Sequence, residues 1–294
     1  MECTVIIPSR DRPESIRQSV ASALAALAMA ERSGTVLVVD DGDEFPVRQA
    51  LAGCSSSALR VEVNPGPKGP SAARNYGAAQ AQSELLFFLD DDDLMEPDYI
   101  QRVLAQRQSG ACKTAWGFSR ARDSRAYHGL PEHPSMLGPD VPLRQRLAGL
   151  GTGFWIERGV FRRLGGLDED LRINEDTDFC LTLAGADLMP WYEPQSGVKL
   201  EAARSAQGAT DRPSTTTSTR AAERAAAWQS ILEKHAILLA NHPVECGIFS
   251  ARVAKYRARA GDVKGALAVA IRQSGTARWR ALAQAVAGAA TRKR

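Results

Sequence analysis

The chain has 294 residues, of which 44% are hydrophobic and 24% are charged, and its formal net charge at pH 7 is +3. This length suits one large α/β domain with an appended region. No apolar run reaches the roughly 18 residues of a membrane-spanning helix, and the first residues lack the basic start of a signal peptide, so the sequence favours a cytoplasmic location.

The five cysteines are odd in number and widely scattered, and no two of them form a Cys-x-x-Cys pair. Zinc and iron–sulfur sites depend on such pairs, so this spacing argues against them. We therefore expect reduced thiols that pack as small apolar side chains.

The first half of the chain alternates short apolar strands with helical segments. Strands are expected at residues 4–8, 36–39, 60–64 and 85–89, and helices at 13–30 and from residue 71. Continuous apolar strands separated by helices predict a mostly parallel, Rossmann-like α/β sheet covered by helices on both faces. Ligands of such sheets bind beyond the carboxyl ends of the strands.

The second half is less regular. Residues 118–148 have weak periodicity, and we expect them to be partly irregular. Further strands are expected at 151–157 and 188–193, with helices near 159–164 and 175–184. The polar, Ser/Thr-rich stretch that follows predicts a flexible linker, and the remainder is helical. The expected organisation is a body at 1–204, a linker at 205–220 and a helical region at 221–294.

Charge is unevenly distributed along the chain. From Arg220 onward, 14 Lys and Arg stand against 4 Asp and Glu, a net charge of +10, whereas the preceding 219 residues carry 23 against 30, a net charge of −7. The basic helices suit peripheral contact with an anionic membrane, a lipid-linked diphosphate or nucleic acid. The alternative, a solvated basic face, is slightly favoured by the sequence.

Four consecutive carboxylates, from Asp90 to Asp93, follow the apolar strand at 85–89. Adjacent carboxylates repel one another, so a cation is needed to neutralise them at a buried strand end. Carboxylate oxygens suit hard ions such as Mg²⁺ or Mn²⁺, which in turn bind diphosphates. The plain alternative is a solvated acidic turn before a helix.

Three other segments place polar groups where they can join such a site. Asp40 and Asp41 follow a buried strand and can accept hydrogen bonds from a base or ribose, or they form a simple Asp-Gly turn. Arg74 begins a helix after a Pro/Gly turn and can hold a phosphate, or it forms a surface ion pair. Glu175 and Asp176 begin a helix, where carboxylates are favoured by the helix dipole or serve as a general base.

Together these segments resemble family 2 glycosyltransferases of the GT-A fold. The matching segments occur in the order of that family, they cover about residues 3–205, and six of them carry the resemblance. They are Val5–Arg10, Val38–Gly42, Ser71–Gly77, Phe88–Asp93, Gly165–Glu169 and Asn174–Phe179.

The resemblance implies a role for each candidate residue. Asp90 and Asp92 are similar to the acidic positions of the DxD motif, with Asp92 on the metal, Asp90 on the ribose or the metal, and Asp91 beside them. The resemblance also implies that Asp176 is the catalytic base, with Glu175 next to it. The remaining nucleotide-sugar contacts would come from Pro8, Ser9, Arg10, Asp40, Asp41 and Arg74.

The implied activity is metal-dependent, inverting transfer of a sugar from a nucleotide-diphosphate donor, with UDP as the default nucleotide. The acceptor hydroxyl can belong to a glycan, a lipid-linked molecule, a small molecule or a nucleic acid. The alternatives are a retaining transferase, a nucleotidyltransferase or a non-catalytic nucleotide-sugar-binding module. The chain departs from the family at Thr182, where many relatives have Arg, and at Arg204, near where many have a His.

Overall fold

The computed structural model describes residues 2–43, 46–122, 129–200 and 219–291. The chain forms two compact units. The first, here called the sheet unit, contains Met1–Asp170 and Ala186–Pro213, and the second, the helical unit, contains Leu171–Gly185 and Ser214–Arg294. Most of the expected linker, residues 205–218, lies outside the described residues, as does Arg204.

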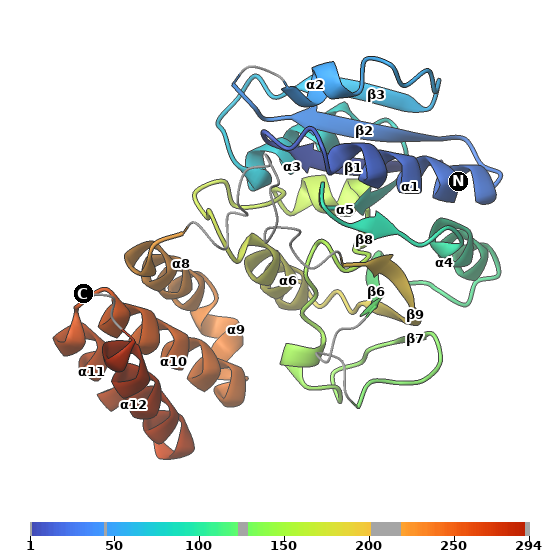
Figure 1. The fold of residues 1–294 in the computed structure, drawn as a ribbon. Helices are drawn as coiled ribbons and strands as arrows, with labels where there is room; N and C mark the ends of the chain where they lie inside the picture. Colours follow the sequence, from blue (N-terminus) through green and yellow to red (C-terminus); the bar gives the residue numbers. More distant parts are fainter. Residues whose placement is uncertain (1, 44–45, 123–128, 201–218, 292–294) are drawn as a thin grey trace. The chain divides into compact units, whose positions relative to one another are not determined.

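The sheet unit is built on a mixed sheet with the strand order β3-β2-β1-β4-β8-β6-β9-β5, in which β7 also pairs with β9 (Figure 1). The first four strands in this order are parallel, and β8 is antiparallel to both β4 and β6. The strands are β1 (Cys3–Ser9), β2 (Gly34–Asp40), β3 (Leu59–Val63), β4 (Leu85–Phe88), β5 (Leu94–Met95), β6 (Trp116–Arg122), β7 (Ser135–Met136), β8 (Trp155–Glu157) and β9 (Trp191–Lys199).

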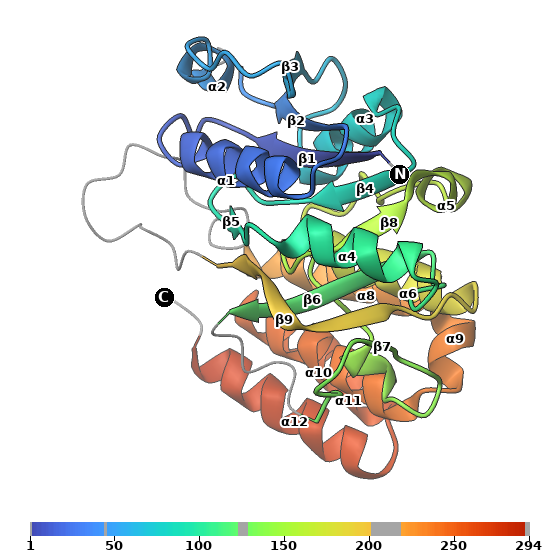
Figure 2. The same ribbon diagram turned by 90° about the vertical axis from the view of Figure 1, so that its right-hand side faces the viewer.

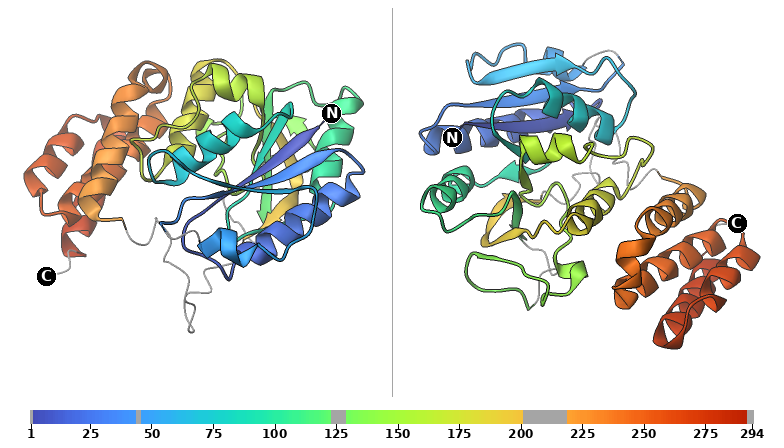
Figure 3. Two further views of the ribbon diagram at one scale, coloured as in Figure 1. Left: turned by 90° about the horizontal axis from the view of Figure 1, so that it is seen from above. Right: turned by 180° about the vertical axis from the view of Figure 1, so that it is seen from behind.

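Helices cover both faces of this sheet, as Figure 2 and the left view of Figure 3 show. They are α1 (Ile16–Met29), α2 (Pro46–Ala50), α3 (Pro70–Gln80), α4 (Tyr99–Gln108) and α5 (Arg158–Arg163). Alternation along β1 explains the two faces, because successive side chains of a strand point to opposite sides. Val5 and Ile7 share a core with α1 and α4, whereas Ile6 faces α3. The predicted α/β architecture with helices on both faces is confirmed.

A glycine brings α3 down onto the sheet. A Cβ atom at Gly77 would lie 2.7 Å from Ile6 Cγ2 and 3.2 Å from Val39 Cγ2. No side chain fits in that space, so the helix backbone rests directly on β1 and β2. Arg74 lies one turn earlier on the same helix.

The region expected to be irregular contains a central strand. Residues 116–122 form β6, which pairs with β8 and β9. Its pattern is hard to recognise, because Gly117 and Ser119 interrupt the apolar residues. Gly117 lies against the Trp155 ring, and the buried Ser119 accepts a hydrogen bond from the amide of Gly197 at 2.9 Å.

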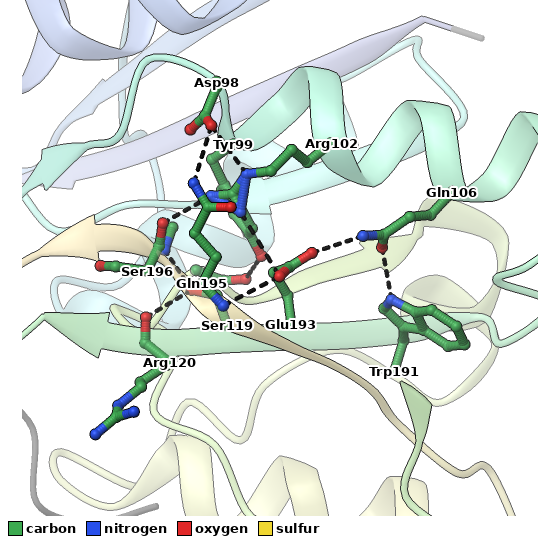
Figure 4. A network of polar contacts seen from close by, with 12 residues as sticks. Asp98, Tyr99, Arg102, Gln106, Ser119, Arg120, Trp191, Glu193, Gln195 and Ser196 are labelled. Atoms are coloured by element: carbon green, nitrogen blue, oxygen red, sulfur yellow. Dashed lines mark hydrogen bonds and ion pairs between the residues drawn. The ribbon is translucent and has the colours of Figure 1, made fainter. Parts of the chain in front are cut away.

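A polar network joins α4 to β9 (Figure 4). Glu193 is buried, accepts a 2.6 Å hydrogen bond from Gln106 Nε2, and lies 3.7 Å from a nitrogen of Arg102. Arg102 also donates to the carbonyl of Ser196 at 2.7 Å. The pairing of β9 with β6 shifts register at this point. The network therefore supplies hydrogen-bond partners for backbone groups, such as the Ser196 carbonyl, that regular strand pairing would otherwise satisfy.

The helical unit contains α6 (Glu175–Gly185), α8 (Ala221–Lys234), α9 (Ala236–Ala240), α10 (Pro243–Arg259), α11 (Val263–Ile271) and α12 (Gly275–Ala290). The last three helices pack through alanines, and Gly288 of α12 lies directly on the backbone of Lys255. The expected C-terminal helical extension is confirmed. Within the ranges that the structure describes, no helix combines the length and hydropathy needed to cross a membrane.

Candidate active site

The candidate site lies where the parallel strands β1, β2 and β4 end. These strands are neighbours in register, with Ser9 opposite Asp40 and Ile6 opposite Phe88. Their carboxyl ends therefore bring Ser9, Asp40 and the acidic residues after β4 to the same edge of the sheet.

The two outer members of the motif Asp90-Asp91-Asp92 are accessible, and the middle one is not. The side chains of Asp90 and Asp92 are 37% and 38% exposed, whereas that of Asp91 is 9% exposed. Asp93 is also buried, and its amide donates a hydrogen bond to the carbonyl of Asp90. The accessible pair is thus the pair to which the sequence resemblance assigns the donor and the metal.

Two arginines neutralise these carboxylates. Arg12 Nη1 lies 2.7 Å from both Asp91 Oδ1 and Asp92 Oδ2, and Arg74 Nη2 lies 2.6 Å from Asp90 Oδ1. The hydroxyl of Ser9 donates to Asp91 Oδ2 at 2.5 Å. Burial raises the pKa of Asp91 to about 7, against the opposing effect of Arg12. Burial alone would lower the pKa of Arg12, but Asp91 and Asp92 outweigh it and raise that pKa.

The loop before β8 approaches the acidic motif closely. A Cβ atom at Gly151 would lie 2.6 Å from Asp90 Oδ2 and 3.3 Å from Asp93 Oδ2. The loop therefore limits the positions that the Asp90 carboxylate can adopt, and only glycine permits this approach.

Asp40 and Asp41 are both buried at the end of β2. Asp40 accepts hydrogen bonds from the amides of Gly42 and Arg48 at 3.1 and 2.9 Å, so it holds the loop that follows. Asp41 accepts from Asn64 Nδ2 at 2.7 Å and from the amide of Gly69 at 2.9 Å. Burial raises the pKa of Asp41, against the opposing effect of these hydrogen bonds.

The end of β1 and the turn after it place both buried residues and charged residues at the site. Pro8 and Ser9 are buried, and Arg10 lies 3.5 Å from Asp43 and 3.8 Å from Asp11. Asp11 adopts a φ of 56°, and the chain turns there so that Arg12 reaches Asp91 and Asp92. The sequence analysis does not identify Arg12 as a site residue. The feature that could have identified it is a cation just after one strand, β1, when carboxylates follow the neighbouring strand, β4.

Asp176 and Glu175 lie in the first turn of α6, in the helical unit. The amide of Thr177 donates to Asp176 Oδ1 at 2.6 Å. Asn174, with a φ of 62°, precedes the helix. Two residues after Asp176, the buried Asp178 lies 2.7 Å from Lys234 Nζ and 2.8 Å from His235 Nε2, so α6 is tied to the end of α8.

The donors at the sheet edge suit a hard divalent ion in part. Asp90 and Asp92 offer accessible carboxylate oxygens, the ligand type that Mg²⁺ and Mn²⁺ prefer. Among the residues that the structure describes, no group of three or more His, Cys, Asp or Glu side chains is arranged to hold a metal. An ion here would need its remaining ligands from water or from a bound ligand.

Comparison with known proteins agrees with the resemblance seen in the sequence. The family model described as glycosyl transferase family 2 matches residues 4–165. A pre-mycofactocin glycosyltransferase of Mycobacterium tuberculosis is 28% identical over 207 residues, which cover 66% of this chain and 41% of that protein. The succinoglycan biosynthesis protein ExoU of Rhizobium meliloti is 36% identical over 107 residues, which cover 35% of this chain and 29% of the relative.

Solved structures show the same fold. The structure of S. aureus TarS residues 1–349 in complex with UDP-GlcNAc has a TM-score of 0.63 at 14% identity, and the match covers 98% of this chain and 89% of that one. The chain spans less than half the length of the mycobacterial relative. Since the family model covers more than half of the chain, the chain belongs to glycosyl transferase family 2.

Proposed function

We propose that this protein transfers a sugar from a nucleotide-diphosphate donor to an acceptor hydroxyl. The observation that carries the proposal is the pair Asp90 and Asp92, accessible at the carboxyl edge of a parallel sheet and each contacting a cation, Arg74 or Arg12. Ligands of such sheets bind at this edge. Family membership and the names of the relatives support the same activity.

The donor nucleotide would lie over the ends of β1 and β2. Asp41, fixed by Asn64, would contact the base or ribose together with the backbone of Pro8, Ser9 and Arg10, and Asp40 would order the loop beside them. A uridine diphosphate sugar is the first donor to test, because TarS was solved with UDP-GlcNAc and with UDP.

Arg74 and the accessible carboxylates would meet the diphosphate. Asp92, with Asp90, would hold Mn²⁺ or Mg²⁺. A bound ion of this kind stabilises the negative charge that develops on the leaving diphosphate. Asp91 is buried and bound to Ser9 and Arg12, so its role is to fix the loop that carries its neighbours.

Asp176 would act as the general base, with Glu175 beside it. It would remove the proton from the acceptor hydroxyl while the oxygen attacks the anomeric carbon from the side opposite the diphosphate. This displacement inverts the configuration and needs no covalent intermediate. A position at the start of α6, held by the hydrogen bond from the Thr177 amide, suits a fixed carboxylate.

Paired substitutions test these two roles separately. We expect Asp176→Asn to lower transfer by about 10²- to 10⁴-fold while the Kd of the nucleotide changes little, because only the base is lost. We expect Asp92→Asn to weaken nucleotide binding in the presence of Mn²⁺, as measured by calorimetry. Asp187→Asn, on an exposed turn, serves as the matched control. Normal turnover by Asp176→Asn contradicts the base assignment.

The products separate the alternatives. An inverting transferase releases a nucleoside diphosphate and forms the opposite anomer, a retaining enzyme keeps the anomer, and a nucleotidyltransferase releases pyrophosphate. A non-catalytic module binds the sugar nucleotide without turnover. Screening a panel of sugar nucleotides for slow hydrolysis therefore tests the activity and identifies the donor together.

A further inference from the structure

One face of α10 carries a row of cations around a tyrosine. Arg252, Lys255, Tyr256 and Arg259 are spaced i, i+3, i+4 and i+7, which places them on one side of the helix. Arg259 lies 5.8 Å and Lys255 5.9 Å from the centre of the Tyr256 ring. From α8, Arg224 approaches the same ring at 5.5 Å. We call these four cations and Tyr256 the α10 cluster.

Aromatic rings hold the cluster in place. The guanidinium of Arg252 lies 4.4 Å from the centre of the Trp228 ring, and Trp228 is buried against Phe249. An arginine stacked on a rigid ring loses little further freedom when it binds an anion. The cluster is therefore more ordered than a set of free surface side chains.

In the part of the chain that the structure describes, three cations of the cluster form no close ion pair. Within the described ranges, no carboxylate lies within 4 Å of Arg252, Lys255 or Arg259, although Arg259 donates to the Thr291 hydroxyl. The carboxylates of Glu223 and Asp262 contact other arginines, Arg220 and Arg257. Cations gathered on one helix face repel one another, and an anionic ligand relieves that repulsion.

The cluster lies in the same unit as the proposed base. Arg252 stacks on Trp228 of α8, and the end of the same helix is bound to α6 through Asp178, two residues after Asp176. Burial lowers the pKa of Arg252, and the charge of Asp176 acts in the opposite direction. All the residues concerned belong to α6, α8 and α10 of the helical unit. An anionic group bound at the cluster would therefore lie in the same unit as the carboxylate that would activate the acceptor hydroxyl.

From these contacts we infer that the α10 cluster is an acceptor subsite for phosphate-bearing acceptors, such as a phosphodiester polymer or a lipid-linked phosphate. The inference rests on the proposed function. Stacked arginines and an unpaired lysine recognise phosphate oxygens, and a base beside them recognises a hydroxyl on the same molecule.

The test compares two triple variants of the full chain. One is Arg252→Gln, Lys255→Gln and Arg259→Gln; the matched control is Arg272→Gln, Arg278→Gln and Arg280→Gln, which removes the same charge from exposed positions on and beside α11 and α12. The probe is short-chain inorganic polyphosphate, measured by calorimetry. We expect the cluster variant to bind at least about tenfold more weakly and the control to change less than about twofold.

Two further measurements keep the result interpretable. The variant Arg252→Lys with Arg259→Lys keeps the charge but loses the planar guanidinium groups, so it should bind polyphosphate more weakly than the unsubstituted protein and more tightly than the Gln variant. A circular dichroism spectrum and a urea midpoint equal to those of the unsubstituted protein exclude a folding defect in the Gln variant. Nucleotide-sugar hydrolysis should be equal in both triple variants. If the unsubstituted protein hydrolyses no sugar nucleotide, the proposed function fails; if it does so but the two triple variants lose polyphosphate binding equally, only the acceptor subsite fails.

Vesicles distinguish the source of the phosphate. Phosphatidylglycerol vesicles are added in place of polyphosphate, with phosphatidylcholine vesicles as the neutral comparison. Loss of binding to both anionic probes in the cluster variant supports recognition of phosphate from either source. Binding to vesicles alone, unchanged in the cluster variant, overturns the proposal and indicates instead a membrane contact elsewhere on the chain.

Discussion

Single residues at the sheet edge divide the acidic run into two kinds of carboxylate. Asp91 and Asp93 are buried, whereas Asp90 and Asp92 remain accessible, within a turn closed by the hydrogen bond from the Asp93 amide to the Asp90 carbonyl. Asp91 fixes the loop through Ser9 and Arg12, whereas the accessible Asp90 and Asp92 each contact an arginine and keep part of their surface exposed. The run of like charges is therefore tolerated because Arg12 and Arg74 contact three of its four carboxylates.

The pair formed by Arg12 and Asp91 should be strongly coupled. We expect Arg12→Met to lower the free energy of unfolding by about 3 kcal/mol, because it leaves a buried carboxylate without its cation. Asp91→Asn in the same chain should restore about half of that loss, since no buried charge then remains. Urea denaturation of both single variants and the double variant measures the coupling, and additive losses would show that the pair does not act as a unit.

Gly151 should affect the donor more than the fold. We expect Gly151→Ala to weaken nucleotide-sugar binding by about tenfold, because the new Cβ displaces the Asp90 carboxylate from Arg74. The stability should fall by less than about 1 kcal/mol, since the displaced atom ends a flexible side chain. Gly159→Ala, with open space around it, is the control and should leave binding unchanged.

The sequence alone predicts the residues whose position at a strand end is readable, such as Asp40, Asp90 and Asp92. It does not predict Arg12, Asn64 or Gly151. Their importance depends on which segments meet in space: Asn64 reaches Asp41 across 23 residues, and Arg12 reaches Asp91 across 79. Local pattern carries no information about such pairings.

At the scale of elements, α6 is tied to α8 by a buried carboxylate. Burial would raise the pKa of Asp178, but hydrogen bonds from His235 and Lys234 outweigh it and lower that pKa. Because its pKa is lowered, the carboxylate stabilises the folded state at pH values above the pKa of an ordinary aspartate. This contribution is lost as the pH falls through the pKa of Asp178 in the folded state.

We therefore expect Asp178→Asn to cost about 2 kcal/mol at pH 7, a value reduced for the 42% exposure of Lys234. The unsubstituted protein should lose stability below about pH 4, and the variant should lose less over the same range. Chemical denaturation at several pH values, followed by circular dichroism, gives both quantities. Asp262→Asn, which keeps a good helix N-cap, should behave like the unsubstituted protein at pH 7.

The strands that the sequence predicts well are those with an unbroken run of apolar residues. The strands at the start of the chain appear where the sequence places them, within one or two residues. The sequence does not predict strand β6, because contacts with neighbouring segments stabilise it. The Trp155 ring occupies the space beside Gly117, and the hydroxyl of Ser119 accepts a hydrogen bond from the amide of Gly197. A strand whose own side chains supply little of its packing leaves a weak pattern in the sequence.

For the whole molecule, the uneven charge predicts two ligands with different responses to salt. The segment from Arg220 onward carries +10 and the rest −7. With about three phosphates neutralised at the α10 cluster, a tenfold rise in salt should weaken polyphosphate binding by about 100-fold. Nucleotide-sugar binding, in which a single buried arginine, Arg74, would meet the diphosphate, should change by less than about fivefold. Equal responses in calorimetric titrations over that salt range would show that both ligands are held by the same diffuse charge.

The direct contact of α3 with the sheet at Gly77 has a consequence for variant screens. Arg74, which contacts Asp90, is carried on the helix that this glycine seats. Any larger residue at position 77 lifts the helix and moves the guanidinium with it, although position 77 itself faces the sheet. A variant screen that measures donor affinity would therefore rank Gly77 among the ligand-binding positions. The positions with large effects would include residues that pack beneath the site as well as residues that contact the ligand.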